Sequence, residues 1–163
     1  ALCDSWATIG KPESRRGNTI TSLALEADVQ ERHNIKLQKK YAEIEANEVR
    51  YSTYKTEDAE HLIVAFGCMS RIGEAVVDYA REQGYKVGLL RPITLFPYPK
   101  AAIEALIPQL KSIMSVELNA GQMVEDIKVI ANGRVPVNFY GRQGGMIPDP
   151  EEVFEAFVKS INK

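Results

Sequence analysis

Short, continuous apolar runs alternate with longer amphipathic segments from residue 61 to the end of the chain. The apolar runs end in glycine or polar residues, which predicts buried strands. They lie at residues 61–67, 85–90, 113–116 and 135–141. The amphipathic segments carry apolar residues on one helical face, which predicts helices at residues 70–84, 100–106, 123–130 and 150–161. This alternation favours a single α/β sheet joined by right-handed crossovers.

Residues at the ends of these helices match the positions that they would take. Gly84 suits the position just after a helix, where the backbone is often left-handed. Pro99 suits the first turn of the second helix, and Pro108 suits its end. Asp149 suits the cap of the last helix, with Pro150 in its first turn. We therefore expect one folded α/β domain over residues 57–163.

The chain before residue 57 has a different pattern. Residues 1 to about 24 contain scattered glycines and a proline, which is typical of a connector. Residues 30–47 favour a helix whose apolar stripe, Leu37, Tyr41 and Ile44, is too sparse for a core helix. We expect residues 1–56 to be a connector whose helix is mostly solvated or packs on a partner. Residues 49–54 are the candidate for a further strand.

The charge of the chain is nearly balanced, with 20 basic and 22 acidic residues and a formal net charge of −2. No cluster of lysines and arginines stands out, so nucleic acid is not an expected partner. No apolar run approaches the roughly 20 residues that span a bilayer, and the start of the chain lacks a charged leader followed by an apolar stretch. We expect a soluble, cytoplasmic protein without membrane contact. Because the chain begins at Ala1 with an irregular segment, we also expect a fragment of a longer polypeptide.

The two cysteines, Cys3 and Cys68, lie far apart and lack the C-x-x-C spacing of metal sites. They are expected to be free thiols, so this chain alone should hold neither an iron–sulfur cluster nor a structural zinc ion. His61 and Cys68 mark opposite ends of one strand, roughly 20 Å apart at the strand rise. A Cys–His nucleophile is therefore not expected, and Cys68 is interpreted as a packed thiol.

A carboxylate, Glu117, stands where the third strand ends. In open α/β sheets, ligands meet the carboxyl ends of strands and the N-termini of the helices that follow. Asn119 and Gln122 have the spacing of the N-cap and N3 residues of a capping box. Glu117 and Asn119 are either a general base and its partner in a cleft, or residues that cap the helix, order the loop or contact a subunit. The pattern favours the second interpretation.

Polar residues also follow the other expected strands. The glycines at 67 and 73, on either side of Ser70, lack the G-x-G-x-x-G spacing of dinucleotide-binding loops, and no P-loop is present. Arg91 stands where a ribose-binding acid is usual. It would suit a 2′-phosphate or a coenzyme A phosphate, but a surface arginine paired with a nearby carboxylate is the favoured interpretation. Arg142 opens a glycine-rich loop that either closes on a ligand or simply connects two elements.

Three segments in order resemble the C-terminal part of the alpha subunit of 2-oxoacid:ferredoxin oxidoreductases. They read LIVAFGCMSRIGEAVVDYAREQGYKVGLLRPITLFPYP, SVELNAGQMVEDIKV and VPVNFYGRQGGMIPDPEEV. Within that family, VELNAGQM followed by FYGRQGGMIP most resembles the 2-ketoisovalerate or branched-chain type, with the 2-oxoglutarate type second. The upstream segments DSWATIG, RRGNTITS and LQKKYAEIEANEVRYSTY resemble the connector that precedes this domain.

This resemblance implies a fold and a reaction. The fold is a three-layer α/β/α sandwich with a mixed, mostly parallel five-stranded sheet, like the C-terminal domain of transketolase. The reaction is the oxidative decarboxylation of a 2-oxoacid on thiamine diphosphate. Electrons pass through iron–sulfur clusters to ferredoxin, and coenzyme A captures the acyl group. The cofactor performs this chemistry, and protein groups orient it.

The chain departs from a complete enzyme of this family. It lacks a Gly-Asp-Gly motif with an asparagine-rich segment for Mg²⁺ and pyrophosphate, and it lacks cluster cysteines. Thiamine diphosphate, Mg²⁺ and the clusters are therefore expected on other subunits: a thiamine-binding beta, a gamma and a ferredoxin-like delta subunit. The isolated chain is expected to be inactive, with no catalytic residue of its own, and to serve in structure and assembly. The residues expected at its strand-end edge or subunit interface are Ser70, Arg91, Glu117, Asn119, Gln122 and Arg142.

Three alternatives stay open. The enzyme could be the 2-oxoglutarate- or pyruvate-specific member of the same family. A free-standing Rossmann-like module that binds a nucleotide or coenzyme A would rest on Arg91 and Ser70 near the sheet edge. An interaction adaptor without enzyme activity would rest on the solvated helix at residues 30–47.

Overall fold

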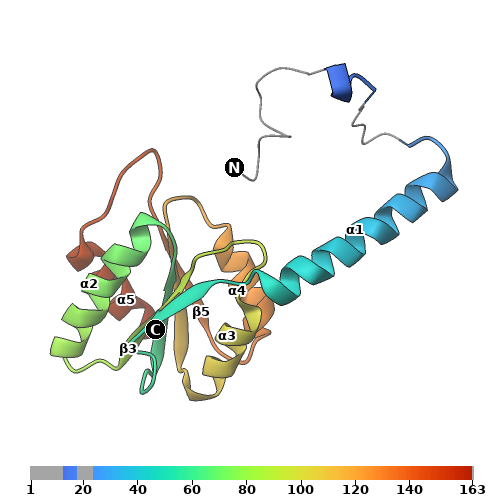
Figure 1. Ribbon diagram of the computed structural model, residues 1–163. Coiled ribbons are helices and arrows are strands. Elements are labelled where there is room, and N and C mark those ends of the chain that lie inside the picture. The colour runs from blue at the N-terminus through green and yellow to red at the C-terminus, as the bar shows by residue number, and fades with distance from the viewer. Residues whose placement is uncertain (1–12, 18–23, 163) are drawn as a thin grey trace. The chain divides into compact units, whose positions relative to one another are not determined.

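The computed structural model describes residues 13–17 and 24–162, so Cys3 lies outside the described residues (Figure 1). The chain divides into two compact units, residues 1–41 and 42–163, and each is described by itself. The first contains a short 3₁₀ helix, η1 (Glu13–Arg15), and the larger part of helix α1 (Ala27–Asn47). Helix α1 has no buried residue, which agrees with the solvated helix expected from the sequence.

The second unit is built on a five-stranded sheet with the order β1-β3-β2-β4-β5. The strands are β1 (Tyr51–Tyr54), β2 (His61–Ala65), β3 (Val87–Pro92), β4 (Ser112–Glu117) and β5 (Val137–Gly141). Strand β1 runs antiparallel to β3, and the other neighbours are parallel. The expected strands are confirmed, including the candidate near residues 49–54. The domain boundary between residues 56 and 57 stays a prediction, although β1 before it belongs to the sheet.

Helices cover both faces of this sheet (Figure 1). The helices α2 (Cys68–Glu82) and α5 (Pro150–Ile161) lie on one face, and α3 (Lys100–Leu106) and α4 (Met123–Ala131) lie on the other. A 3₁₀ turn, η2 (Ile107–Gln109), follows α3 and contains Pro108. The expected three-layer α/β/α sandwich with a mixed, mostly parallel sheet is confirmed.

The central strands are buried on both faces, so their side chains alternate between two cores. In β2, Leu62 and Val64 belong to the core with α3 and α4, whereas Ile63 and Ala65 belong to the core with α2 and α5. Burying a leucine, isoleucine or valine side chain stabilises the fold by roughly 1.5–3 kcal/mol. The two cores therefore hold the strand ends in fixed positions, and they explain the continuous apolar runs in the sequence.

The helix ends mostly follow the sequence. Gly84 has a φ of +88°, the left-handed geometry expected after α2. Pro150 begins α5 and Asp149 is its N-cap residue, but the Asp149 carboxylate makes no capping hydrogen bond. The backbone carbonyl of Asp149 accepts from the N–H of Val153 at 3.3 Å, which is the ordinary first hydrogen bond of a helix.

The strand order creates a switch point between β2 and β4. From β2 the chain passes through α2 to β3, whereas β3 leads through α3 back across β2 to β4. These two connections cover opposite faces of the sheet, so a crevice opens at the carboxyl ends of β2 and β4. Open α/β sheets bind ligands at such a point. The residues that follow Ala65, together with Glu117 at the end of β4, are therefore the first place to look for a site.

His61 links the amino ends of β2 and β4, because its Nδ1 atom lies 2.8 Å from the hydroxyl oxygen of Ser112. Burial lowers the pKa of His61 below the usual 6.5. The folded chain favours the neutral imidazole, so its stabilising contribution is present above about pH 6.5 and is lost as the pH falls through the folded-state pKa.

We expect the free energy of unfolding, measured by denaturant titration, to fall as the pH drops from 7 towards 5, and His61→Gln to remove part of that fall. His33→Gln on the exposed helix α1 is the matched control for replacing a histidine by glutamine. Identical profiles for His61→Gln and the unmodified chain would contradict this account of the strand ends.

Candidate functional site

Glu117 ends β4 at the switch point, and its side chain is completely buried. Strand β4 is buried along its whole length, and the chain then turns through residues 118–122 into α4. A carboxylate in such a place costs free energy unless hydrogen bonds replace the water that it has lost. The contacts of its two oxygens therefore decide what Glu117 does.

Four donors surround the carboxylate of Glu117. Oε1 accepts from the Ser115 hydroxyl at 2.8 Å and from the N–H of Val124 at 2.9 Å. Oε2 accepts from the N–H of Met123 at 2.8 Å and from that of Gln122 at 3.1 Å. Backbone N–H groups in the first turn of a helix have no partner within the helix. Glu117 therefore caps α4, and the cap comes from the preceding strand.

These donors keep Glu117 ionised despite its burial. Burial alone would raise its pKa, but the Ser115 hydroxyl and the N–H groups of Met123 and Gln122 outweigh it, so the pKa of Glu117 lies below the usual 4.5. The positive end of the α4 dipole acts in the same direction. The stabilising contribution of Glu117 is therefore present above about pH 4.5 and is lost as the pH falls through the lower folded-state pKa.

The prediction that Asn119 and Gln122 form a capping box is wrong. Helix α4 begins at Met123, and Gln122 takes the N-cap position without a side-chain capping bond. The Asn119 side chain accepts from the N–H of Gly121 at 2.7 Å and closes a tight turn, in which Gly121 has a φ of +106°. Because this turn brings the first N–H groups of α4 onto Glu117, they are already satisfied and need no local cap.

The geometry decides between the two interpretations of Glu117. A general base must reach a proton of the bound substrate and have a pKa suited to accepting it. Glu117 is fully buried and has a lowered pKa, so it meets neither condition. Its contacts describe a residue that orders the loop and the start of α4. An external anion at the N-terminus of α4 would have to displace Glu117 from the same N–H groups.

A cavity of about 210 Å³ lies beside Glu117 at the carboxyl ends of β2 and β4. Apolar and polar side chains line it together: Phe66, Leu95, Tyr98, Glu117, Asn119, Gln122, Met123 and Asp126. Tyr98 is only 8% exposed, and its hydroxyl has no hydrogen-bond partner among the described residues. The structure thus brings three of the expected residues, Glu117, Asn119 and Gln122, to one site.

Tyr98 and Asp126 are members of this site that the sequence analysis missed. Tyr98 lies in the proline-rich loop after β3, and Asp126 lies on the polar side of α4. Both fall within the segments that carry the family resemblance, but neither directly follows a strand, where site residues were sought. The signal that would have found Tyr98 is the strand order. A loop that leads from β3 towards β4 must cross the end of β2, and so must pass the switch point.

The expected site residues on the β2 and β3 side do not line this cavity. Ser70 is buried in the first turn of α2, and its hydroxyl donates to the Gly67 carbonyl at 2.8 Å. Arg91 lies beside Ser52 of β1, and its Nε atom is buried with no partner in the described part of the chain. The carboxylate partner favoured from the sequence is therefore not seen at that atom. Cys68 is exposed, so its interpretation as a packed thiol is wrong.

Arg142 fixes the start of the glycine loop after β5 and is not among the residues that line the cavity. Its guanidinium pairs with Glu152 of α5, which also accepts from the Tyr140 hydroxyl at 2.6 Å. The backbone N–H of Arg142 donates to the carbonyl of Glu117 at 3.2 Å. Arg142 thus ties the loop to α5 and to the end of β4.

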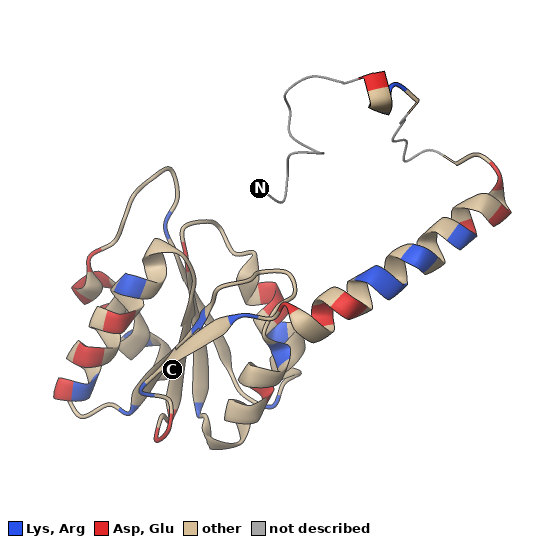
Figure 2. Ribbon diagram, in the orientation of Figure 1, with Lys and Arg blue, Asp and Glu red and all other residues tan. Residues whose placement is uncertain are grey.

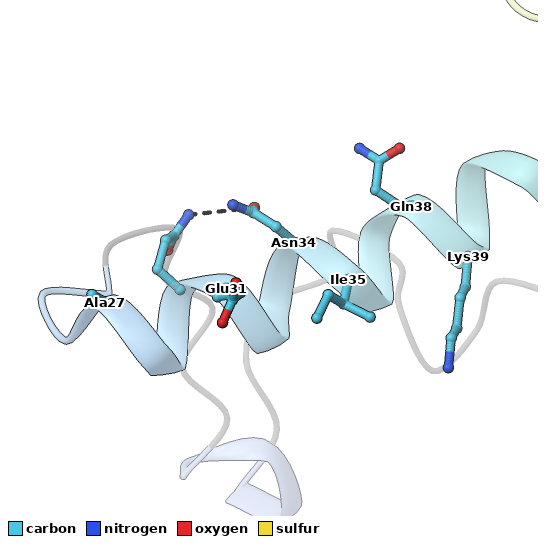
Figure 3. A pocket seen from close by; sticks show the side chains of 7 residues that line it. Ala27, Glu31, Asn34, Ile35, Gln38 and Lys39 are labelled. Carbon is cyan, nitrogen blue, oxygen red and sulfur yellow. Dashed lines mark hydrogen bonds between the residues drawn. The ribbon is translucent and has the colours of Figure 1, made fainter.

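A hollow along α1 is a weaker candidate site (Figure 3). The described side chains around it all come from that one helix: Ala27, Gln30, Glu31, Asn34, Ile35, Gln38 and Lys39. Figure 3 shows Gln38 and Lys39 pointing away from each other, while Gln30 donates to Asn34 at 3.5 Å. Side chains of a single helix do not enclose a ligand, so this hollow supports no site.

Charged residues are spread over the described part of the chain. Figure 2 shows charges of both signs along α1 and over the second unit. Within residues 13–17 and 24–162, no group of three His, Cys, Asp or Glu side chains is placed to hold a metal ion. No helix in that part of the chain combines the length and apolar character needed to cross a membrane.

The sequence of this chain is similar to those of known proteins. Residues 59–153 match the family model described as pyruvate:ferredoxin oxidoreductase core domain II. The ketoisovalerate oxidoreductase subunit VorB of Methanothermobacter marburgensis is 46% identical over 149 residues, which are 91% of this chain and 42% of that protein. The chain thus spans less than half the length of this curated relative.

Two solved structures share the fold. A chain of the 2-oxoglutarate:ferredoxin oxidoreductase from Magnetococcus marinus, with 2-oxoglutarate, coenzyme A and succinyl-CoA bound, has a TM-score of 0.68 and 18% identity. That match covers 85% of this chain and 24% of the other. A split-gene transketolase in an inactive beta4 tetramer has a TM-score of 0.59 and 14% identity over 69% of this chain and 41% of the other. These likenesses confirm the expected fold of the transketolase C-terminal domain.

Replacing Glu117 by glutamine tests its capping role. Glutamine has the same shape, but its amide nitrogen cannot accept the hydrogen bonds that Glu117 receives. Each buried donor left unsatisfied costs roughly 1–3 kcal/mol. We therefore expect Glu117→Gln to lower the free energy of unfolding at pH 7 by about 3 kcal/mol in a denaturant titration followed by circular dichroism.

The matched control is Glu125→Gln, which removes an exposed carboxylate of α4 that pairs with Lys128. Its effect should stay below about 1 kcal/mol, the range of surface pairs and helix-end charges. A loss for Glu117→Gln no larger than that of the control would contradict the capping role.

Proposed function

The chain belongs to the family of the pyruvate:ferredoxin oxidoreductase core domain II, and from this premise we propose that it is the C-terminal domain of the alpha subunit of a 2-oxoacid:ferredoxin oxidoreductase. The whole enzyme would oxidatively decarboxylate a 2-oxoacid to an acyl-CoA and pass the electrons to ferredoxin. The observation that carries the proposal is the identity to the ketoisovalerate oxidoreductase subunit over most of this chain.

For the substrate, we propose 2-ketoisovalerate or another branched-chain 2-oxoacid. The relative at 46% identity is a ketoisovalerate oxidoreductase subunit, whereas the 2-oxoglutarate enzyme among the solved structures is only 18% identical. Enzymes specific for 2-oxoglutarate or pyruvate are the alternatives within the family. Turnover of the whole enzyme with each of these 2-oxoacids would identify the substrate.

The proposed role of this chain is structure and assembly, because its described residues do not fit the cofactors of the reaction. A pyrophosphate with Mg²⁺ needs oxygen ligands and a free anion site. The Glu117 carboxylate already occupies the N-terminus of α4. In the described residues, no three His, Cys, Asp or Glu side chains are placed so that they could hold a metal ion. Cys68 is the only cysteine in the same part of the chain, which is too few for a cluster.

Other subunits would therefore hold the cofactors. We place thiamine diphosphate and Mg²⁺ on a thiamine-binding beta subunit and the iron–sulfur clusters on the remaining subunits, including a gamma and a ferredoxin-like delta subunit. Ferredoxin and coenzyme A would be partners of the complex in the cytoplasm.

Exposed apolar side chains at the strand-end edge support the assembly role. The loop after β3 exposes Ile93 and Leu95, and the loop after β5 exposes Met146 and Ile147. Both loops follow carboxyl ends of parallel strands and so lie at the same edge of the sheet. Exposed apolar surface of this kind marks a site of protein contact. We propose that this edge faces a neighbouring subunit or domain.

One observation favours the alternative of a free-standing module for a nucleotide or coenzyme A. The buried Nε atom of Arg91 has no partner among the described residues and would suit a phosphate oxygen. Two contacts oppose it, because the Ser70 hydroxyl is already bonded to Gly67 and Glu117 occupies the N-terminus of α4. The assembly role therefore has more support.

Purification of the native assembly tests the proposed function. The full-length protein that contains this chain would be tagged at its C-terminus and purified without oxygen. We expect other subunits, iron–sulfur absorbance and reduction of an artificial electron acceptor that requires both 2-ketoisovalerate and coenzyme A. Turnover with 2-oxoglutarate and pyruvate should be slower. A colourless protein without partners or turnover would contradict the proposal.

A thermal shift assay of this chain tests the alternative. The ligands are NADP, coenzyme A, and thiamine diphosphate with Mg²⁺. A ligand that binds only the folded state raises the melting temperature in a saturable way. We expect none of these ligands to do so, because we propose that the chain binds none of them by itself. A saturable increase with NADP or coenzyme A, lost in Arg91→Gln, would favour the module.

A further inference from the structure

Tyr98 holds a buried hydroxyl that nothing in the described residues uses. Its ring belongs to the core formed with α3 and α4, and the residue also lines the cavity beside Glu117. A buried hydroxyl without a partner destabilises the folded state, because it has lost its hydrogen bonds to water. Burial first, and then the negative charges of Asp126 and Glu117, raise the pKa of Tyr98, and all three residues line the same cavity.

The cavity around this hydroxyl suits a positive group. Glu117 remains ionised there, although its oxygens are committed to Ser115 and α4. Asp126 lines the same cavity from the exposed side of α4 and has no ion pair within the described residues. The amide side chains of Asn119 and Gln122 complete the polar wall. A cationic donor would pair with Asp126, whereas an anion would be repelled.

Apolar surface adjoins this polar cavity. A second hollow of about 450 Å³ shares Leu95, Tyr98 and Asp126 with it and extends past Val49 and Tyr51, and charged residues of both signs also line it. Leu95 is 49% exposed and Tyr51 is 46% exposed. A small free cation would leave these side chains in water, whereas a protein surface would cover them.

We propose that the cavity beside Glu117 receives one arginine or lysine side chain from a neighbouring subunit, whose apolar surface covers the adjoining hollow. The Tyr98 hydroxyl oxygen accepts a hydrogen bond from the cationic group, and the Asp126 carboxylate supplies the opposite charge. The cavity volume of about 210 Å³ lies below the roughly 300–1,000 Å³ of small-molecule sites and suits a single side chain. This inference rests on the proposed assembly role and adds to it the residues and the chemistry of the contact.

The test uses the oxygen-free complex assembled from full-length protein with Tyr98→Phe, Asp126→Asn, both changes, or the control Glu125→Gln. The control removes an equivalent charge from the neighbouring residue of α4, where it pairs with Lys128. Subunit dissociation is followed by analytical ultracentrifugation over a dilution series. We expect each test variant to raise the dissociation constant at least about tenfold, as for one partner of a buried polar pair. The loss of binding free energy in the double variant should be smaller than the sum of the losses in the two single variants, because both residues contact the same side chain.

A second measurement separates this contact from a folding defect. In the isolated chain, Tyr98→Phe should leave the melting temperature unchanged or raise it, because it removes an unpartnered hydroxyl. A lowered melting temperature would show that the hydroxyl has a partner inside the chain and would overturn the inference.

The possible failures are distinguishable. If no other subunit co-purifies with the unmodified protein, the proposed function and this inference both fail. If the complex forms but Tyr98→Phe and Asp126→Asn dissociate like the control, only the inference fails.

Discussion

The strand-end edge of this domain depends on the contact between the Glu117 carboxylate and the first turn of α4. Three backbone N–H groups that would otherwise lack partners donate to it, and Ser115 adds a fourth hydrogen bond. The Glu117 carbonyl also accepts from the N–H of Arg142, which brings in the loop after β5. One residue thus joins β4, α4 and β5 at the point where the fold opens its crevice.

Glu117 fills the place at the switch point where many α/β folds bind an anionic ligand. Helix N-termini at strand ends bind anions in many such folds, and the fold alone does not decide the function. In this chain the anion is an internal carboxylate, fully buried and held by the strand that precedes the helix. The space that remains beside it is lined by Tyr98 and Asp126, and it suits a side chain from another protein. This arrangement supports the assembly role that we propose for the same edge of the sheet.

Much of the fold could be predicted from the sequence, because burial on both faces of the sheet imposes runs such as the one at residues 61–65. Strand β1 was only a candidate, since YSTY at residues 51–54 is an edge strand with mostly exposed side chains. The position of Glu117 and its ordering of the loop were predictable, but the capping of α4 was assigned to Asn119 and Gln122. Its hydrogen bonds reach across a turn whose shape depends on the φ of Gly121, and such a contact leaves no periodic trace in the sequence. Tyr98 was missed because its importance comes from the strand order.

The most direct test of this account is amide hydrogen exchange of Gln122, Met123 and Val124, measured by NMR with and without coenzyme A or thiamine diphosphate plus Mg²⁺. If Glu117 occupies the N-terminus of α4, these amides should exchange slowly at neutral pH, and their resonances should not move when either ligand is added. Rapid exchange, or a saturable shift of these resonances, would contradict the account, because the N-terminus of α4 would then be free to bind a ligand.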